Sequence, residues 1–258
     1  MHLWRVDLDV DGETEEDLRK QLPPADIAKS ESFASPRARR RYIVTRGTLR
    51  TLLSSQLDER PRSIPIQVGP NGKPYVHGAD HEIHFNVSHS ADTAMICIAT
   101  CGAVGVDLES ARHVPAAVAL ARRHFTPVEA SFVEAGGTAG AAARFLLCWT
   151  RKEALVKAIG AGLNLDLSSF VVPLTSPGAI LLIDDPEGGP PRRWLLLDVP
   201  LGDRHVAALA LPASAANRGA LPAPGPAQAL CDRPMDHREE IDVPALISSA
   251  ILGTGGHD

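Results

Sequence analysis

One stretch, AVGVDLES at residues 103–110, constrains the fold more than any other part of the sequence. Its apolar and polar residues alternate, and successive side chains of a β-strand point to opposite faces of the sheet. The stretch is therefore predicted to be a strand with one polar face, which carries Asp107 and Glu109. The opposite, apolar face consists of Val104, Val106 and Leu108.

Two carboxylates on one face of a strand call for an explanation. Side chains two residues apart lie about 7 Å from each other, and like charges repel there unless a cation lies between them. One alternative is a strand end at the surface, where water solvates both acids. The other is a site for a hard cation, because Mg²⁺ binds one or two carboxylates together with water and substrate phosphates. Asp107 and Glu109 are therefore candidate metal ligands.

A second polar pair lies in WTRKEALVKAIGAGL, residues 149–163. The pattern predicts a long helix, and Glu153 and Lys157, four residues apart, share one of its faces. An exposed ion pair of this kind contributes only about 0.2–0.5 kcal/mol. The apolar residues around the pair indicate, however, that much of this helix is packed. A third carboxylate and an ammonium group would then complete a magnesium and phosphate site.

Further elements follow from local patterns. A helix is expected over residues 36–57, and Asn71-Gly72 predicts the turn of a hairpin over residues 66–76. Thr126 and Glu129 form a capping-box pattern at the start of another helix. Strand-like runs lie at residues 2–10, 82–90, 93–109, 168–174, 179–183, 193–199 and 205–211.

Composition limits the function classes. The net charge of −5 does not favour binding of bulk nucleic acid, and no apolar run is long enough to span a membrane. The first ten residues do not resemble a signal peptide, and the cysteines form no CxxC pair. We therefore expect a cytoplasmic protein with free thiols at Cys97, Cys101, Cys148 and Cys231.

The composition changes near residue 213, where Ala, Pro and Gly dominate without any period. Residues 213–258 are predicted to be a flexible tail, with one short apolar contact at VPALISSAIL. On this basis, we expect a chain that ends at residue 212 to keep its melting temperature.

Four stretches, GPNGKPYV, FNVSHS, GVDLE and WTRKEALVKAIGAGL, occur in an order that resembles one family: the 4′-phosphopantetheinyl transferases of the larger, surfactin-type class. The resemblance covers about residues 1–211. It implies an enzyme that moves the phosphopantetheine arm of coenzyme A onto a serine of an acyl or peptidyl carrier protein, leaving 3′,5′-ADP. It further implies that Mg²⁺, or Mn²⁺ in its place, is held by Asp107, Glu109 and Glu153.

The resemblance also assigns residues to coenzyme A. Lys157 matches the lysine on the phosphates, and Asp107, Glu153 and Lys157 form the implied catalytic set. The other implied coenzyme ligands are Lys73, Ser88 and His89, with Lys29, Arg41 and Arg46 on the nucleotide. The proton of the carrier serine would pass to Glu153 directly or through a water molecule on the metal, and the sequence leaves both routes open.

The implied fold is α+β, with two similar halves packed side by side and the active site in the cleft between them. The halves would cover residues 1–104 and 105–212, in a monomer without nucleic-acid or membrane partners. One alternative is a non-catalytic protein of the same fold that binds coenzyme A or a nucleotide. Another, a basic interaction module built on PRARRRYIVTR, fits the overall charge balance poorly.

Overall fold

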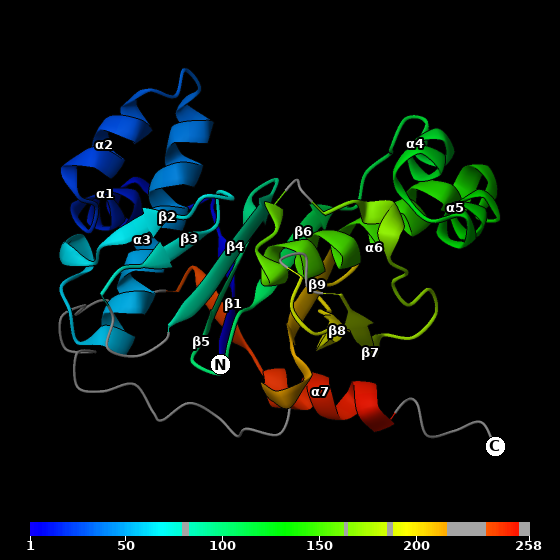
Figure 1. Ribbon diagram of the computed structural model, residues 1–258. Coiled ribbons are helices and arrows are strands. Elements are labelled where there is room, and N and C mark those ends of the chain that lie inside the picture. Colours follow the sequence, from blue (N-terminus) through cyan, green and yellow to red (C-terminus); the bar gives the residue numbers. More distant parts are fainter. Residues whose placement is uncertain (79–82, 163–164, 185–187, 216–235, 253–258) are drawn as a thin grey trace.

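The computed structural model of the protein describes residues 1–78, 83–162, 165–184, 188–215 and 236–252. Within them, two four-stranded antiparallel sheets and one small hairpin are formed (Figure 1). The first sheet has the order β10-β1-β5-β4, from β1 (His2–Asp7), β4 (His84–Ser90), β5 (Thr93–Ala99) and β10 (Arg238–Ile241). The second has the order β6-β9-β8-β7, from β6 (Gly105–Ser110), β7 (Gly178–Ile183), β8 (Arg192–Asp198) and β9 (His205–Pro212). The hairpin pairs β2 (Ile66–Val68) with β3 (Pro74–Val76).

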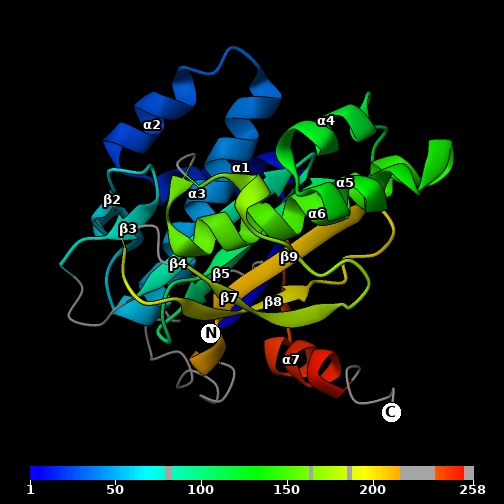
Figure 2. The same cartoon turned by 45° about the vertical axis from the view of Figure 1, so that its right-hand side comes forward.

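Helices pack against both sheets. The first group consists of α1 (Gly12–Lys20), α2 (Pro24–Glu31) and α3 (Pro36–Leu57). In this group, α3 contacts β5 of the first sheet, and α1 and α2 pack against α3. In the second group, α6 lies along β6 and β9 (Figure 2), and the group consists of α4 (Ala117–His124), α5 (Pro127–Glu134) and α6 (Gly137–Ile159). A last helix, α7 (Val243–Leu252), contacts β7 and β8. No helix of the described residues is both long and apolar enough to cross a bilayer.

Most predicted elements are confirmed, and the structure contains both helices and strands, as the α+β prediction requires. The helix predicted over residues 36–57 is α3, with Ser35 as its N-cap. The capping box of Thr126 and Glu129 opens α5, and Gly160 ends α6 in the left-handed conformation. The strand predicted over residues 168–174 is wrong.

The structure has a short 3-10 helix, Leu167–Ser169, followed by irregular chain in that region. The side chain of Asp166 accepts a hydrogen bond from the backbone N–H of Ser168 and so starts this turn. The carbonyl oxygens of Leu167 and Phe170 accept hydrogen bonds from a buried lysine, Lys152. Side-chain partners thus replace the strand ladder that the apolar pattern predicted.

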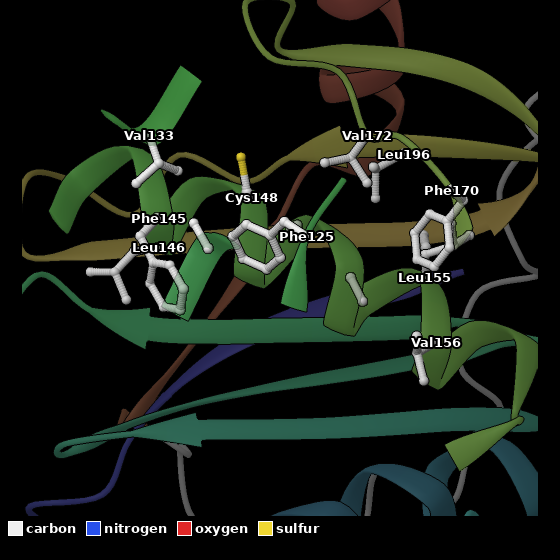
Figure 3. Close-up of a cluster of buried hydrophobic side chains, with 14 of the residues drawn as sticks. Phe125, Val133, Phe145, Leu146, Cys148, Leu155, Val156, Phe170, Val172 and Leu196 are labelled. Carbon is white, nitrogen blue, oxygen red and sulfur yellow. The ribbon is translucent and has the colours of Figure 1, made fainter. Parts of the chain in front are cut away.

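Apolar side chains form three clusters around the sheets. One lies between α3 and the first sheet, and another between α6, α5 and the second sheet (Figure 3). The third holds residues of both sheets, among them Leu3 of β1, Val106 of β6 and Leu197 of β8. The apolar face predicted for residues 103–110 is confirmed, since Val104, Val106 and Leu108 are all buried in this third cluster.

Within the described residues, Cys97, Cys101 and Cys148 are free, as predicted, and Cys231 lies outside those residues. Burial raises the pKa of the Cys97 and Cys148 thiols to about 12. Both groups therefore stay protonated at neutral pH, so they pack as small apolar side chains rather than act as nucleophiles.

The end of the chain differs from the predicted flexible tail of residues 213–258. β10 is an edge strand of the first sheet, in register with β1 from Leu3 opposite Ile241 to Val6 opposite Arg238. In α7, Val243 and Ala250 are buried in the cluster that both sheets share. Residues 216–235 and 253–258 of the predicted tail lie outside the described residues. The segment 236–252 therefore contacts both sheets.

A chain that ends at residue 215 is now expected to melt at least about 5 °C below the full chain. The truncation exposes the edge of β1 and uncovers apolar side chains of the shared cluster, so both backbone pairing and buried area are lost. Thermal unfolding followed by circular dichroism measures the shift. A chain that ends at residue 252 is the control, because it keeps every described element. Equal melting temperatures for the 215-residue chain and the full chain would contradict this expectation.

Candidate active site

β4 and β6, each at the edge of its own sheet, are joined by side chains. Backbone N–H groups of β6 donate to side-chain oxygens of β4: Val106 to Asn86 Oδ1 (2.9 Å), Leu108 to Ser88 Oγ (3.2 Å) and Ser110 to Ser90 Oγ (2.9 Å). Alternate residues of a strand share a face, so the polar residues of FNVSHS form one row toward β6. The other edge of β6 pairs with β9. β6, with its two acids, is thus held from both sides.

Asp107 lies at the centre of this contact. Its Oδ1 accepts hydrogen bonds from Ser88 Oγ (2.9 Å) and from Lys157 Nζ (2.5 Å), and Lys157 Nζ also lies 3.3 Å from Ser88 Oγ. The residue is 5% exposed. Its second oxygen, Oδ2, is buried and has no hydrogen-bond partner. Oδ1 of Asp107 is therefore bound by the ammonium group of Lys157, while Oδ2 is free to accept a ligand.

Glu153 and Lys157 come to this place because α6 lies very close to β6. A Cβ atom on Gly105 would lie 2.1 Å from the carbonyl oxygen of Ala154, so only glycine allows this approach. Burial raises the pKa of the Glu153 carboxyl, and the charges of Asp107 and Glu109 raise it further, while Lys157 lowers it. The pair is thus packed against the acids of β6 rather than exposed on a free helix face.

Glu109 follows Asp107 by two residues on β6, near the end of that strand. Its Oε2 lies 3.4 Å from Ser90 Oγ and 3.2 Å from the guanidinium of Arg112. Within the described part of the chain, no three His, Cys, Asp or Glu side chains are gathered closely enough to form a metal site. The three predicted ligands are neighbours, but Lys157 and Arg112 hold two of them in this structure.

A pocket of about 620 Å³ opens beside these residues. Its walls come from the β2–β3 hairpin, from β4 and from α6, and include Lys73, Glu153 and Lys157. Apolar side chains, among them Trp149, also line this pocket. Further lining residues, which the sequence patterns did not single out, are Asn86, Val87, His124, Val156, Leu165 and Leu167. The alternating polar residues of FNVSHS were the available signal for Asn86.

The remaining predicted coenzyme ligands lie outside the described lining of this pocket. Lys29 is exposed, with its ammonium group 5.7 Å from the ring centroid of Phe33. His89 is exposed on β4.

Both predicted arginines have carboxylate partners. Arg41 Nη2 lies 2.9 Å from Asp92 Oδ1, and Arg46 Nη2 lies 3.4 Å from Asp26 Oδ1. Sequence spacing gives no information on these partners because they lie on other elements. The structure thus gathers Asp107, Glu153, Lys157 and Ser88 around one place, with Lys73 in the pocket lining. Lys29, Arg41, Arg46 and His89 lie outside that lining.

Buried carboxylates beside a lysine and an adjacent pocket form a candidate active site. Two family models match this chain: the N-terminal model of 4′-phosphopantetheinyl transferase over residues 14–101, and the 4′-phosphopantetheinyl transferase superfamily over residues 103–210.

Named relatives agree with the family models. The chain is 31% identical over 213 residues to the 4′-phosphopantetheinyl transferase HetI of Nostoc sp., covering 82% of this chain and 87% of the relative. It is 27% identical over 175 residues to Sfp of Bacillus subtilis (strain 168), covering 68% and 76%. The protein therefore belongs to the 4′-phosphopantetheinyl transferase superfamily and is a transferase. The predicted resemblance is confirmed.

Proposed function

We propose that this transferase moves the 4′-phosphopantetheine arm of coenzyme A to a serine of an apo acyl or peptidyl carrier protein and releases 3′,5′-ADP. The names of its relatives support the transferred group. The observation that carries the proposal is the convergence of Asp107, Glu153 and Lys157, of which Glu153 and Lys157 line the pocket. We further propose that residues 1–104 and 105–212 are similar α+β halves, with the site in the cleft between them.

In this proposal, Lys157 binds phosphate and Glu153 accepts a proton. Lys157 would bind the pyrophosphate oxygens of coenzyme A as a point charge. The carrier serine oxygen attacks the β-phosphorus, and the bond from that phosphorus to the bridging oxygen breaks, so the electron pair leaves with 3′,5′-ADP. The proton of the serine hydroxyl moves to Glu153. Its raised pKa makes this carboxylate a better proton acceptor than an exposed glutamate.

The three carboxylates of the site are also of the ligand type that a divalent metal ion prefers. Mg²⁺ prefers carboxylate oxygens, and Asp107 Oδ2 is a buried oxygen without a partner. Asp107, Glu109 and Glu153 would hold Mg²⁺, or Mn²⁺ in its place, once Lys157 turns to the substrate. Such an ion supplies charge neutralisation on the pyrophosphate.

The nucleotide would lie beyond the pocket, toward the basic residues of the first helices and β4. Lys29 and His89 are exposed, so they can contact phosphate directly. Arg41 and Arg46 would exchange carboxylate partners for phosphate, and Ser88 would serve mainly to hold Asp107.

Mass spectrometry of a carrier protein tests the function directly. The protein is incubated with coenzyme A, Mg²⁺ and a panel of apo acyl and peptidyl carriers. At least one carrier should gain the mass of one phosphopantetheine, and the gain should depend on its acceptor serine. Saturable binding of coenzyme A without modification of any carrier would instead favour a non-catalytic coenzyme A-binding protein.

A further inference from the structure

Lys73 lies beside the turn of the β2–β3 hairpin, yet its ammonium group bonds to the facing part of the molecule. Nζ donates to the backbone carbonyl oxygens of Lys157 (2.7 Å), Ala158 (3.0 Å) and Val104 (3.2 Å). An ammonium group has three N–H donors, so these three acceptors satisfy all of them. Burial lowers the pKa of Lys73 to about 8.

Two of these acceptors are at the end of a helix. α6 ends at Ile159, and the last four carbonyls of a helix have no partner within it. Lys73 bonds to two of them, and a cation there also interacts favourably with the helix dipole. The third acceptor, on Val104, directly precedes β6. The ammonium group therefore connects the end of α6 with the start of β6.

The hairpin lies beside this helix end (Figure 2). Asn71 Nδ2 donates to the carbonyl oxygen of Gly160 (3.1 Å). A Cβ atom on Gly162 would lie 2.8 Å from the Asn71 carbonyl oxygen, which leaves no space for a side chain. The contact is thus a specific fit between two segments far apart in the sequence.

We infer that Lys73 is a positioning residue, which sets the end of α6, with Glu153 and Lys157, against β6 and Asp107. It does not bind the 3′-phosphate of coenzyme A, although the family resemblance places Lys73, Ser88 and His89 at positions that hold the coenzyme, that phosphate included. To bind that phosphate, its ammonium group would have to leave the three carbonyl oxygens that accept all of its hydrogen bonds. This inference rests on the proposed function only for its kinetic test.

Lys73→Met removes the donors and nearly keeps the side-chain volume. Because a small misplacement of reacting groups is costly, kcat is expected to fall about tenfold to a hundredfold. The affinities for coenzyme A and for 3′-dephospho-coenzyme A, measured by calorimetry, should keep the same ratio as in the wild type. If Lys73 bound the 3′-phosphate, the variant would lose most of the preference for coenzyme A, and this outcome would overturn the inference.

Hydrogen exchange provides a readout that does not need the transfer reaction. Backbone amides of residues 156–160 should exchange faster in Lys73→Met than in the wild type, because the helix end loses its cap. Lys20→Met, on the exposed surface of α1, is the control and should match the wild type. If Lys73→Met does not fold, Lys73→Gln, which keeps two donors, takes its place. Unchanged exchange at residues 156–160 would overturn the inference, even if no carrier protein is modified by the wild type.

Discussion

Replacing Asp107 with asparagine is expected to lower the transfer rate to a carrier protein about a thousandfold, or about 4 kcal/mol of transition-state stabilisation. Asparagine keeps the shape of the side chain and an oxygen for Ser88. It removes the negative charge beside Lys157 and the free anionic oxygen of the proposed metal site. Single-turnover kinetics with coenzyme A and an apo carrier protein measure the loss.

The same variant is expected to melt within about 2 °C of the wild type. The change removes repulsion between Asp107 and its acidic neighbours, and Lys157 is partly exposed, so water can solvate its ammonium group. Glu239→Gln is a matched control, because this exposed carboxylate pairs only at the surface with Arg5. Mn²⁺ binding, followed by electron paramagnetic resonance, should be weaker in Asp107→Asn than in the wild type, whereas Glu239→Gln should bind Mn²⁺ as the wild type does. Wild-type transfer rates in excess EDTA would rule out the metal.

The central part of the site could be predicted because local patterns encode it. The alternation of residues 103–110 places Asp107 on the polar face of a buried strand, as β6 has it. The four-residue spacing of Glu153 and Lys157 places both on one face of α6. Each of these predictions depends only on the period of one element, which sequence shows directly.

The remaining features depend on partners far along the chain. Arg41 and Arg46 are visible as basic residues, but their partners Asp92 and Asp26 lie on other elements. Lys73 belongs to a recognisable turn, although its acceptors are backbone carbonyls, which every residue has. The family resemblance implies a coenzyme ligand at this position, and the sequence holds no signal for the hydrogen bonds that Lys73 makes to the end of α6.

The C-terminal strand was missed for a related reason. β10 has the short sequence REEI, which has neither an apolar face nor high strand propensity. It forms because the edge of β1 offers backbone partners along the register from Leu3 to Val6. A composition rich in Pro, Ala and Gly before it predicts only that the segment cannot fold by itself.

A second large effect is expected at Lys152, the residue before Glu153. Its side chain is 0% exposed, and Nζ lies 2.9 Å from Glu129 Oε2, which is also 0% exposed. Nζ further donates to the carbonyl oxygens of Leu167 (2.7 Å) and Phe170 (2.6 Å). Burial lowers the pKa of Lys152, whereas its contact with Glu129 raises it. The pair connects α5, α6 and the segment after residue 166.

Lys152→Met should lower the free energy of unfolding by about 3–5 kcal/mol, because it leaves the Glu129 carboxylate buried without its cation. For a chain of this length, the melting temperature should fall by about 10 °C. Glu129 keeps hydrogen bonds from Thr126 N (2.9 Å) and Val172 N (2.9 Å), which limits the loss. Urea unfolding followed by tryptophan fluorescence gives the free energy.

A double variant separates the unpaired charge from the lost packing. Adding Glu129→Gln to Lys152→Met should recover part of the loss, because a neutral amide is less costly to bury without a cation than a carboxylate. Lys20→Met, which breaks an exposed pair with Asp17, is the control and should change stability by less than about 0.5 kcal/mol. A loss below about 1 kcal/mol in Lys152→Met, or no recovery in the double variant, would show that this buried pair does not stabilise the fold through its charges.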